Sequence, residues 1–250
     1  MTSLNNQVDR RHQHALVTEP MKMYGRHPSD ELLSIYSNKP FQGQDPNLAK
    51  IIFLSLDANY SPQISDHPFF SNIIDYHKDS VSFWQKNKNK VHHPFLLGDY
   101  PFNKTKDGVP FHRNFSKLNL SPEYAPHISF VELLNVPTIG KTQSNTFKQL
   151  LYTDENIERL RALESVLLHG KSKFLFVSNK VIQKLHLLKK SHGLFEWITE
   201  KPSRQGSNCP SLIFESNSLL LFYTHHFSAS GIHAQLPAIE QIIKQAIQLP

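Results

Sequence analysis

Four short apolar runs, separated by longer stretches with helical periodicity, constrain this fold more than any other feature of the sequence. The runs occupy residues 51–56, 128–133, 174–177 and 219–223. Apolar runs of this length are typical of strands that are buried on both faces, as in a parallel sheet that is covered by helices.

Helical patterns lie between and after these runs. Apolar residues recur every three or four positions within 157–167, 181–188 and 239–247. Gly170 can end the first of these helices, Asn179 can cap the second, and Pro237 suits the first turn of the third. Strands that alternate with helices predict an α/β fold, with a central four-stranded, mostly parallel sheet that is flanked by helices on both faces. Residues 202–216 are expected to add a short edge strand or a hairpin.

The composition indicates one globular domain. Aliphatic and aromatic residues make up 39% of the 250 residues, and no linker divides residues 29–250, whereas residues 1–28 are polar and are expected to form a partly mobile arm. The single cysteine, Cys209, excludes an internal disulfide framework. The chain shows neither a signal-peptide pattern nor an apolar run of membrane-spanning length, so we expect a cytoplasmic protein without a membrane partner. We also expect a monomer.

The charge balance is positive but does not identify a partner. The chain has 27 Lys and Arg against 21 Asp and Glu, a net charge of +6, and 15 histidines can add to it as the pH falls. Such an excess attracts polyanions, including nucleic acids. It equally serves solubility, and both interpretations stay open at this point.

Polar side chains follow each of the four predicted strands. Asp57 comes directly after the first, Asn135 after the second, Asn179 after the third, and His225 and His226 after the fourth. Ligands of parallel sheets bind beyond the carboxyl ends of the strands. The sequence therefore predicts an active site at this rim, although each residue also has a structural explanation, such as a turn cap for Asp57 or a satisfied, half-buried ring for His226.

Three segments in order resemble the uracil-DNA glycosylase superfamily. The run IIFLSLDANY at 51–60 resembles the strand that leads into the motif GQDPY, and SFVELLNVPT at 129–138 is similar to the strand that ends in LLLN. The segment LLFYTHHFSAS at 220–230 is similar to the motif HPSPLS. The resemblance covers about residues 50–250. It implies a monofunctional DNA glycosylase of base-excision repair that hydrolyses the N-glycosidic bond of a flipped base, uracil or a related deaminated base, without a metal or a cofactor.

The resemblance assigns the chemistry to two strand ends. Asp57 matches the carboxylate that positions water and stabilises the positively charged sugar. His226 matches the histidine that hydrogen-bonds the departing base, with His225 as an alternate, and Ser228 matches a serine that contacts phosphate. Independently of the family, a carboxylate and a hydrogen-bond donor on opposite sides of a breaking N-glycosidic bond stabilise both developing charges.

Base binding is assigned in the same way. Tyr60 matches the ring that crowds the C5 position of the pyrimidine. Phe70 matches the aromatic that stacks on the base, with Phe69 as its alternate, and Asn135 matches the amide that reads the base edge.

The sequence departs from the family at two of the motifs. Ala58 and Asn59 separate Asp57 from Tyr60. In the last motif, Phe227 replaces a proline, and Ser230 stands where the family has its duplex-wedging leucine. The resemblance leaves the wedge role to Ile232.

Two other functions remain open. A metal-dependent hydrolase would use His225, His226 and Asp57, with His92 and His93. A noncatalytic nucleic-acid-binding relative of the same fold would bind DNA but would not catalyse a reaction. Two further segments are basic or aromatic: the run at 84–90 with His92 and His93, and the insertion at 92–115, whose part at 100–115 either stacks on exposed bases or covers the sheet edge.

Overall fold

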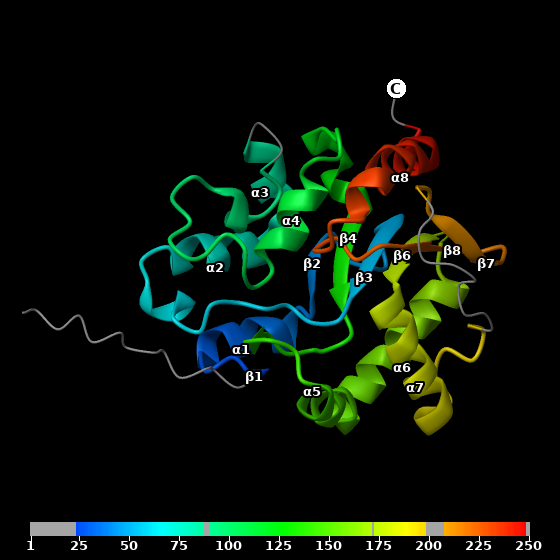
Figure 1. The fold of residues 1–250 in the computed structure, drawn as a ribbon, viewed down its shortest axis with the longest axis horizontal. Helices are drawn as coiled ribbons and strands as arrows, with labels where there is room; N and C mark the ends of the chain where they lie inside the picture. Colours follow the sequence, from blue (N-terminus) through cyan, green and yellow to red (C-terminus); the bar gives the residue numbers. More distant parts are fainter. Residues whose placement is uncertain (1–23, 88–90, 172, 199–207, 249–250) are drawn as a thin grey trace, which may run out of the picture.

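The centre of the molecule is a six-stranded mixed sheet (Figure 1). This computed structural model describes residues 24–87, 91–171, 173–198 and 208–248. The strand order is β2 (Phe41–Gly43), β4 (Ile128–Glu132), β3 (Ile51–Ser55), β6 (Lys173–Ser178), β8 (Leu219–Thr224) and β7 (Ser211–Glu215). The four inner strands, which are the four predicted runs, pair in parallel, whereas β2 and β7 pair antiparallel at the edges.

The expected number of four strands is therefore wrong, because two edge strands extend the sheet. β2 has only three residues, and β7 is partly exposed and interrupted by a register shift between Leu212 and Phe214. Short or exposed edge strands lack the continuous apolar run by which the inner strands were found. The edge strand expected within 202–216 corresponds to β7, and residues 202–207 lie outside the described residues.

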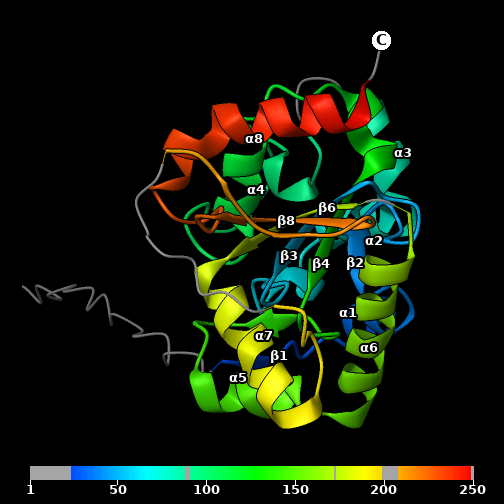
Figure 2. The ribbon, with the colours of Figure 1, turned by 90° about the vertical axis from the view of Figure 1, so that its right-hand side faces the viewer.

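Helices cover both faces of the sheet (Figure 2). One face packs against α5 (Ser144–Leu151), α6 (Asp154–His169) and α7 (Asn179–His192), and the other against α3 (Ser80–Lys86), α4 (Val109–Phe115) and α8 (Ile232–Ile247). A third apolar cluster joins α1 (Asp30–Asn38), α2 (Phe70–Lys78) and the loop after β3. The described residues also include 3₁₀ helices at Ile64–Asp66, Pro94–Leu96 and Pro122–His127.

Alternation along β3 shows how the sheet separates the two main cores. Ile52 and Leu54 belong to the core with α5, α6 and α7, whereas Ile51 and Phe53 belong to the core with α3, α4 and α8. Successive side chains of a strand point to opposite faces, so a strand buried on both sides must be apolar at every position. This explains why the inner strands appear in the sequence as unbroken apolar runs.

Of the three predicted helix-end residues, one is confirmed by the structure and two are wrong. A Cβ on Gly170 would lie within 2.4 Å of the Val166 carbonyl oxygen, so the end of α6 requires a glycine. The N-cap of α7 is Ser178, and Asn179 is the first helical residue instead of the cap. α8 begins at Ile232, which places Pro237 inside the helix and not in its first turn.

Residues 24–28 pack against the domain. β1 (Gly25–Arg26) pairs antiparallel with β5 (Thr138–Ile139), and the amide of His27 donates to the Pro137 carbonyl at 2.9 Å. Tyr24 and His27 are buried. The end of the predicted polar arm thus contributes side chains to the fold, whereas residues 1–23 lie outside the described residues.

The chain reverses its direction across the sheet at β3. From β3 it moves to β4 on one side, and it then returns to β6 on the other side. Such a switch point leaves a crevice at the carboxyl ends of the strands that flank it. The sheet therefore places a binding site beyond the ends of β3, β4 and β6.

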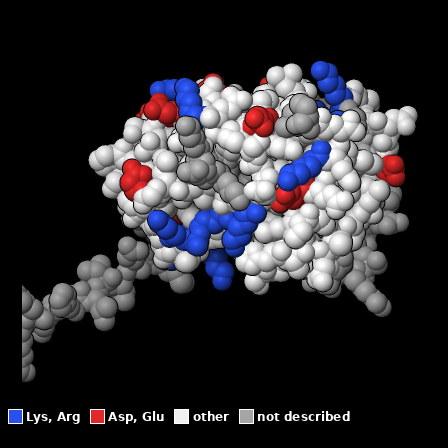
Figure 3. All heavy atoms as spheres, turned by 90° about the horizontal axis from the view of Figure 1, so that it is seen from above, with Lys and Arg blue, Asp and Glu red and all other residues white. Residues whose placement is uncertain are grey.

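The described surface carries both signs of charge. In the face seen from above, acidic side chains are scattered, whereas several Lys and Arg side chains gather in one band (Figure 3). Among the described residues, no helix is long and apolar enough to cross a membrane.

Asn156 is expected to be essential for stability. It is fully buried at the start of α6, where its amide donates to the carbonyls of Leu133 and Leu151 at 3.0 Å each and its Oδ1 accepts from the Asn135 amide at 3.0 Å. Asn156→Ala leaves buried polar groups without partners, and each costs about 1–3 kcal/mol of unfolding free energy. Urea denaturation measures the loss. The matched control, Asn145→Ala on the exposed start of α5, should change stability by less than about 0.5 kcal/mol; an equal loss in both variants would contradict this account.

Candidate functional site

A cavity of about 570 Å³ opens at the carboxyl ends of the inner strands. Its volume lies within the range of about 300–1,000 Å³ that is typical of small-molecule sites. Four of the predicted site residues line it, together with the alternate His225: Asp57, Tyr60, His226 and Ser228. The rim predicted from the strand ends is thus a cavity in the structure.

Asp57 is held at the end of β3 by two hydroxyl groups. Its Oδ2 accepts from the Thr138 hydroxyl at 2.6 Å and from the Tyr24 hydroxyl at 2.9 Å. Burial raises the pKa of Asp57, and the hydrogen bonds from Thr138, Tyr24 and the Asn59 side chain partly oppose this shift. The carboxyl group is therefore fixed in orientation and poorly solvated, which makes its interaction with a nearby positive charge strong.

The loop after Asp57 is fixed by backbone pairing with Thr138. The Thr138 amide donates to the Ala58 carbonyl at 2.8 Å, and the Tyr60 amide donates to the Thr138 carbonyl at 2.9 Å. The Asn59 carbonyl accepts from the Gly108 amide at 2.8 Å. These bonds accommodate the two residues between Asp57 and Tyr60, so both side chains reach the cavity despite the longer spacing.

Tyr60 forms one wall of the cavity. Its ring is buried, lies 5.3 Å from the Phe95 ring between centroids, and is anchored through its hydroxyl to Tyr36 at 3.0 Å and to His77 Nε2 at 3.1 Å. A ring held at both ends cannot swing away when a ligand enters. This position is compatible with the predicted role of Tyr60 in limiting the shape of the ligand.

His226 is a neutral imidazole with a defined tautomer. Its Nδ1 accepts from the Ser228 amide at 3.1 Å, which leaves Nε2 as the protonated nitrogen of the neutral ring. Burial, and to a lesser extent Lys180, lowers the pKa of His226 to about 4. The ring therefore offers an N–H donor to the cavity at neutral pH.

His225 lies beside the same loop but is held differently. Its backbone amide donates to Gln235 Oε1 at 2.8 Å, and a Cβ on Gly231 would lie 3.2 Å from its ring. Both His225 and His226 line the cavity, and Phe111 of α4 packs edge-on against His226 with centroids 5.9 Å apart. Phe111 is half-buried and also lines the cavity, so the insertion at 92–115 contributes an aromatic wall.

The start of α7 adds a polar corner. Ser178 is 5% exposed, lines the cavity, and has a buried hydroxyl without a hydrogen-bond partner among the described residues. The exposed Lys180 and Lys141 line the cavity as well. A helix N-terminus with its free amides, a hydroxyl and two ammonium groups favours an anion at this corner.

Asn135 is not among the residues that line the cavity. Its side chain is 5% exposed and its backbone amide is bound to Asn156. β4 ends at Glu132, three residues earlier than the resemblance suggested, and Asn135 belongs to the turn that follows. The structure therefore does not bring Asn135 to the position from which it would read a base.

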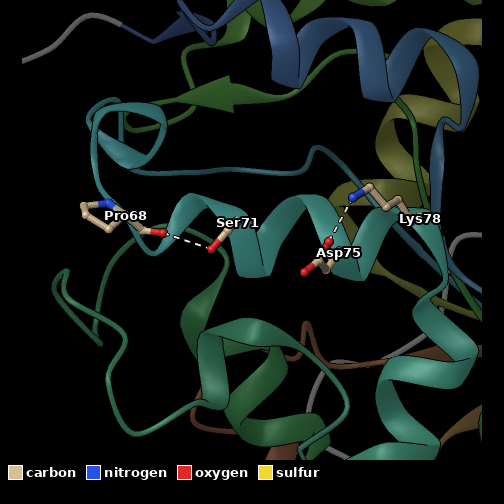
Figure 4. Close-up of polar contacts among 4 residues, drawn as sticks. All are labelled: Pro68, Ser71, Asp75 and Lys78. Atoms are coloured by element: carbon tan, nitrogen blue, oxygen red, sulfur yellow. Dashed lines mark hydrogen bonds and ion pairs between the residues drawn. The ribbon is translucent and has the colours of Figure 1, made fainter.

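Phe69 and Phe70 are also missing from the residues that line the cavity. Both are buried in the apolar cluster with α1, and neither lines the cavity. The opposite side of α2 is exposed and carries ordinary surface contacts: the Ser71 hydroxyl donates to the Pro68 carbonyl, and Lys78 pairs with Asp75, each at 3.0 Å (Figure 4). The aromatic rings of Phe95 and Phe111 line the cavity instead.

The wedge role predicted for Ile232 is wrong. Ile232 is fully buried in the core beneath α8. A side chain that separates base pairs must be exposed on the DNA-binding face.

Sequence reasoning missed three polar residues deep in the cavity. Gln42, His112 and Glu132 line it and are all buried. The sequence contains one indication of such a residue, Glu132 inside the apolar run 128–133. A glutamate within a strand that is buried on both faces is rare, so its presence there predicts a specific role.

The described histidines are not arranged as a metal site. His92, His93 and His112 form a buried cluster, with the rings of His93 and His112 stacked 3.8 Å apart and a hydrogen bond of 3.0 Å between His92 and His112. In the part of the chain that the structure describes, no three His, Cys, Asp or Glu side chains lie where they could hold one metal ion. Lys88 and Lys90 of the basic run at 84–90 lie outside the described residues.

No protein-family model matches this sequence, and no curated protein matches it.

Tyr24 should control the protonation of Asp57. Its hydroxyl donates to the carboxyl and so favours the ionised form, which means that Tyr24→Phe removes this effect and raises the pKa of Asp57 further. Carbon-13 NMR titration of the carboxyl group measures the shift. Tyr152→Phe, on a half-buried ring at the end of α5, is the control and should leave the pKa of Asp57 unchanged; an unchanged pKa in Tyr24→Phe would show that the bond does not matter.

Proposed function

We propose that this protein is a monofunctional DNA glycosylase that hydrolyses the N-glycosidic bond of a flipped-out damaged base, uracil or a related deaminated base. The observation that carries the proposal is one cavity that holds a poorly solvated carboxyl group, Asp57, and a neutral imidazole donor, His226. The ordered resemblance of the three strand-end segments to uracil-DNA glycosylases supports the same activity.

Asp57 acts on the sugar side of the bond. As the bond between the base and C1′ lengthens, positive charge spreads over the sugar ring, and a fixed carboxylate stabilises it more in the transition state than in the ground state. Water then adds to C1′, and its proton passes to the carboxylate. Tyr24 and Thr138 hold the carboxyl in place, so little reorganisation is needed during the reaction.

His226 acts on the base side. The base leaves with the bonding electron pair, and its developing negative charge accepts a hydrogen bond from Nε2–H of the neutral ring. The Ser228 amide fixes this tautomer by donating to Nδ1. The pKa of His226 is about 4, so the ring is uncharged at neutral pH. It therefore donates a hydrogen bond to the base without forming an ion pair with the Asp57 carboxylate.

The cavity walls suit a planar ring. Tyr60, Phe95 and Phe111 line it. A base must leave the helical stack to reach such a site, and stacking on aromatic side chains offsets part of the cost of unstacking. Phe111 is the partly exposed ring of the three, and we assign to it the first contact with the base.

The polar corner at the start of α7 suits the DNA backbone. The unpartnered hydroxyl of Ser178 and the exposed ammonium groups of Lys141 and Lys180 form its anion-binding groups. Phosphate contacts of this kind position a protein on DNA without reading its sequence. The net charge of +6 favours the same partner.

Base release from defined lesions tests the proposal. DNA that carries uracil, hypoxanthine, xanthine, a thymine mismatch or an oxidised pyrimidine is incubated with the protein and then treated with alkali. We expect alkali-dependent cleavage at one lesion, and we expect Asp57→Asn to slow it at least about a hundredfold while affinity for abasic DNA stays nearly the same. Asp66→Asn, on an exposed residue outside the cavity, is the matched control and should keep full activity.

One outcome would refute the role of Asp57, and another would refute the glycosylase activity. Equal losses of rate and of DNA affinity in Asp57→Asn would assign Asp57 a structural role. Tight binding of abasic DNA by the wild-type protein without release of any base would favour a noncatalytic DNA-binding protein.

DNA binding should depend steeply on salt through the lysines of the cavity rim. Each phosphate contact contributes about 0.9 to the slope of log affinity against log salt concentration. The double variant Lys141→Ala, Lys180→Ala should therefore lower the slope by about 1–2, as measured by fluorescence anisotropy. Lys190→Ala, at the far end of α7, should keep the wild-type slope, and salt-independent binding of the wild type would exclude this mode of DNA binding.

A further inference from the structure

A chain of oriented hydrogen bonds runs through the protein interior to the cavity. The Phe95 amide donates to His93 Nδ1 at 3.1 Å, so Nε2 is the protonated nitrogen, and it donates to Gln42 Oε1 at 2.9 Å. The Gln42 amide then donates to Glu132 Oε1 at 2.9 Å. Each member fixes the orientation of the next, and the chain ends on Oε1 of Glu132 as an acceptor.

The other carboxyl oxygen of Glu132 has no hydrogen-bond partner in the part of the chain that the structure describes. Glu132 is 3% exposed and lines the cavity, and its Oε2 makes no hydrogen bond among the described residues. A buried polar atom without a partner costs free energy, so Oε2 gains a favourable hydrogen bond from a ligand group that enters the cavity.

The surroundings of Glu132 keep its carboxyl group neutral. Burial raises the pKa of Glu132 to about 8, and Asp57 adds to the shift, whereas Gln42, Arg159 and the backbone of Glu132 itself oppose it. The Arg159 guanidinium instead donates to the backbone carbonyls of Glu132 and Leu133, at 2.8 and 2.9 Å. The other titratable groups that interact with this carboxyl are the phenols of Tyr36, Tyr60 and Tyr76, whose pKa values are raised and which stay neutral.

The neighbouring histidines do not change this charge. Burial lowers the pKa values of His93 and His112 well below the ordinary range, so both rings are neutral at pH 7. Burial likewise lowers the pKa of His77, which contacts Tyr60, to about 3. With a pKa of about 8, the carboxyl group of Glu132 itself changes charge between pH 7 and pH 9.

We propose that Glu132 is the specificity-determining residue of the cavity and that it reads the lactam edge of a base, a ring carbonyl beside a ring N–H. This inference rests on the proposed function, in which a flipped base fills the cavity. The neutral carboxyl donates from Oε2 to the ring carbonyl, and Oε1 accepts from the ring N–H through its second lone pair. Uracil, hypoxanthine and xanthine present this edge, and so do thymine and guanine, so Glu132 separates these lactam bases from cytosine and adenine. Cytosine and adenine have an exocyclic amine in place of the carbonyl, and that amine faces the O–H donor.

Glutamine offers the same donor and acceptor pair as a neutral carboxyl but does not ionise. Glu132→Gln should therefore bind lactam bases at every pH, whereas the wild type should lose binding as pH rises through about 8. Ionisation removes the donor and places a negative oxygen against the ring carbonyl. With a pKa of about 8, the neutral fraction falls about tenfold between pH 7 and pH 9.

The test measures the affinity of free uracil and free hypoxanthine for the wild type, Glu132→Gln and Glu132→Ala by calorimetry at pH 7 and pH 9. Both bases begin to ionise near pH 9, but this weakens their binding to the wild type and to Glu132→Gln equally. The affinity of the wild type divided by that of Glu132→Gln, for the same base, therefore reports the ionisation of Glu132 alone. We expect this ratio to fall about tenfold, and we expect Glu132→Ala to bind at least tenfold more weakly than Glu132→Gln at pH 7. Glu158→Gln, on the exposed side of α6, is the control and should behave as the wild type.

Three results would overturn the inference: a ratio that does not depend on pH, loss of binding in Glu132→Gln despite a folded protein by circular dichroism, or no binding of either base by the wild type at pH 7. The glycosylase proposal is tested separately, by the release of bases from DNA. Binding with the expected pH dependence, but without release of any base from DNA, would keep the role of Glu132 and reject the catalysis.

Discussion

Parallel pairing of β3 with β4 on one side and β6 on the other is the constraint on which the site depends. It brings the carboxyl ends of three strands to one rim, so Asp57, Glu132 and Ser178 all line one cavity although more than 120 positions separate the first from the last. β8 extends the same parallel arrangement and delivers His226. The helices on both faces keep water away from the sheet, and the cavity is the place where polar groups are concentrated against an apolar interior.

Desolvation gives these polar groups their chemical character. Burial raises the pKa values of Asp57 and Glu132 and lowers that of His226. The two carboxyl groups differ in their partners, because Asp57 accepts two hydroxyl hydrogen bonds that favour its charged form, whereas Glu132 accepts one amide bond. One cavity can therefore hold a carboxyl suited to stabilising positive charge beside a carboxyl suited to recognition as a neutral group.

The sequence predicted the inner strands and the main helices because their signal is local. A strand buried on both faces must be apolar throughout, and a helix repeats its apolar residues every three or four positions, so 51–56 and 157–167 could be recognised without the rest of the chain. The rim residues Asp57 and His226 followed from the strand ends. The edge strands were missed because β2 is three residues long and β7 is irregular.

The site predictions that were wrong concern residues whose positions depend on how distant parts of the chain pack together. Asn135 was chosen by its place after an apolar run, but β4 ends at Glu132, and only the register of the sheet determines which of the two reaches the cavity. The resemblance assigns Phe70 by its position along the chain, which does not fix the direction in which α2 presents its rings. Tyr24 reaches Asp57 because β1 pairs with β5, more than one hundred residues away, and no local pattern reports such a pairing.

A crystal structure of the protein with abasic DNA and free uracil or hypoxanthine tests the central claim most directly. The account predicts electron density for the base inside the 570 Å³ cavity, with its lactam edge against Glu132, one face toward Phe111 and the abasic sugar beside Asp57. Density for the base outside this cavity, or DNA bound on a face that does not include Lys141 and Lys180, would contradict it.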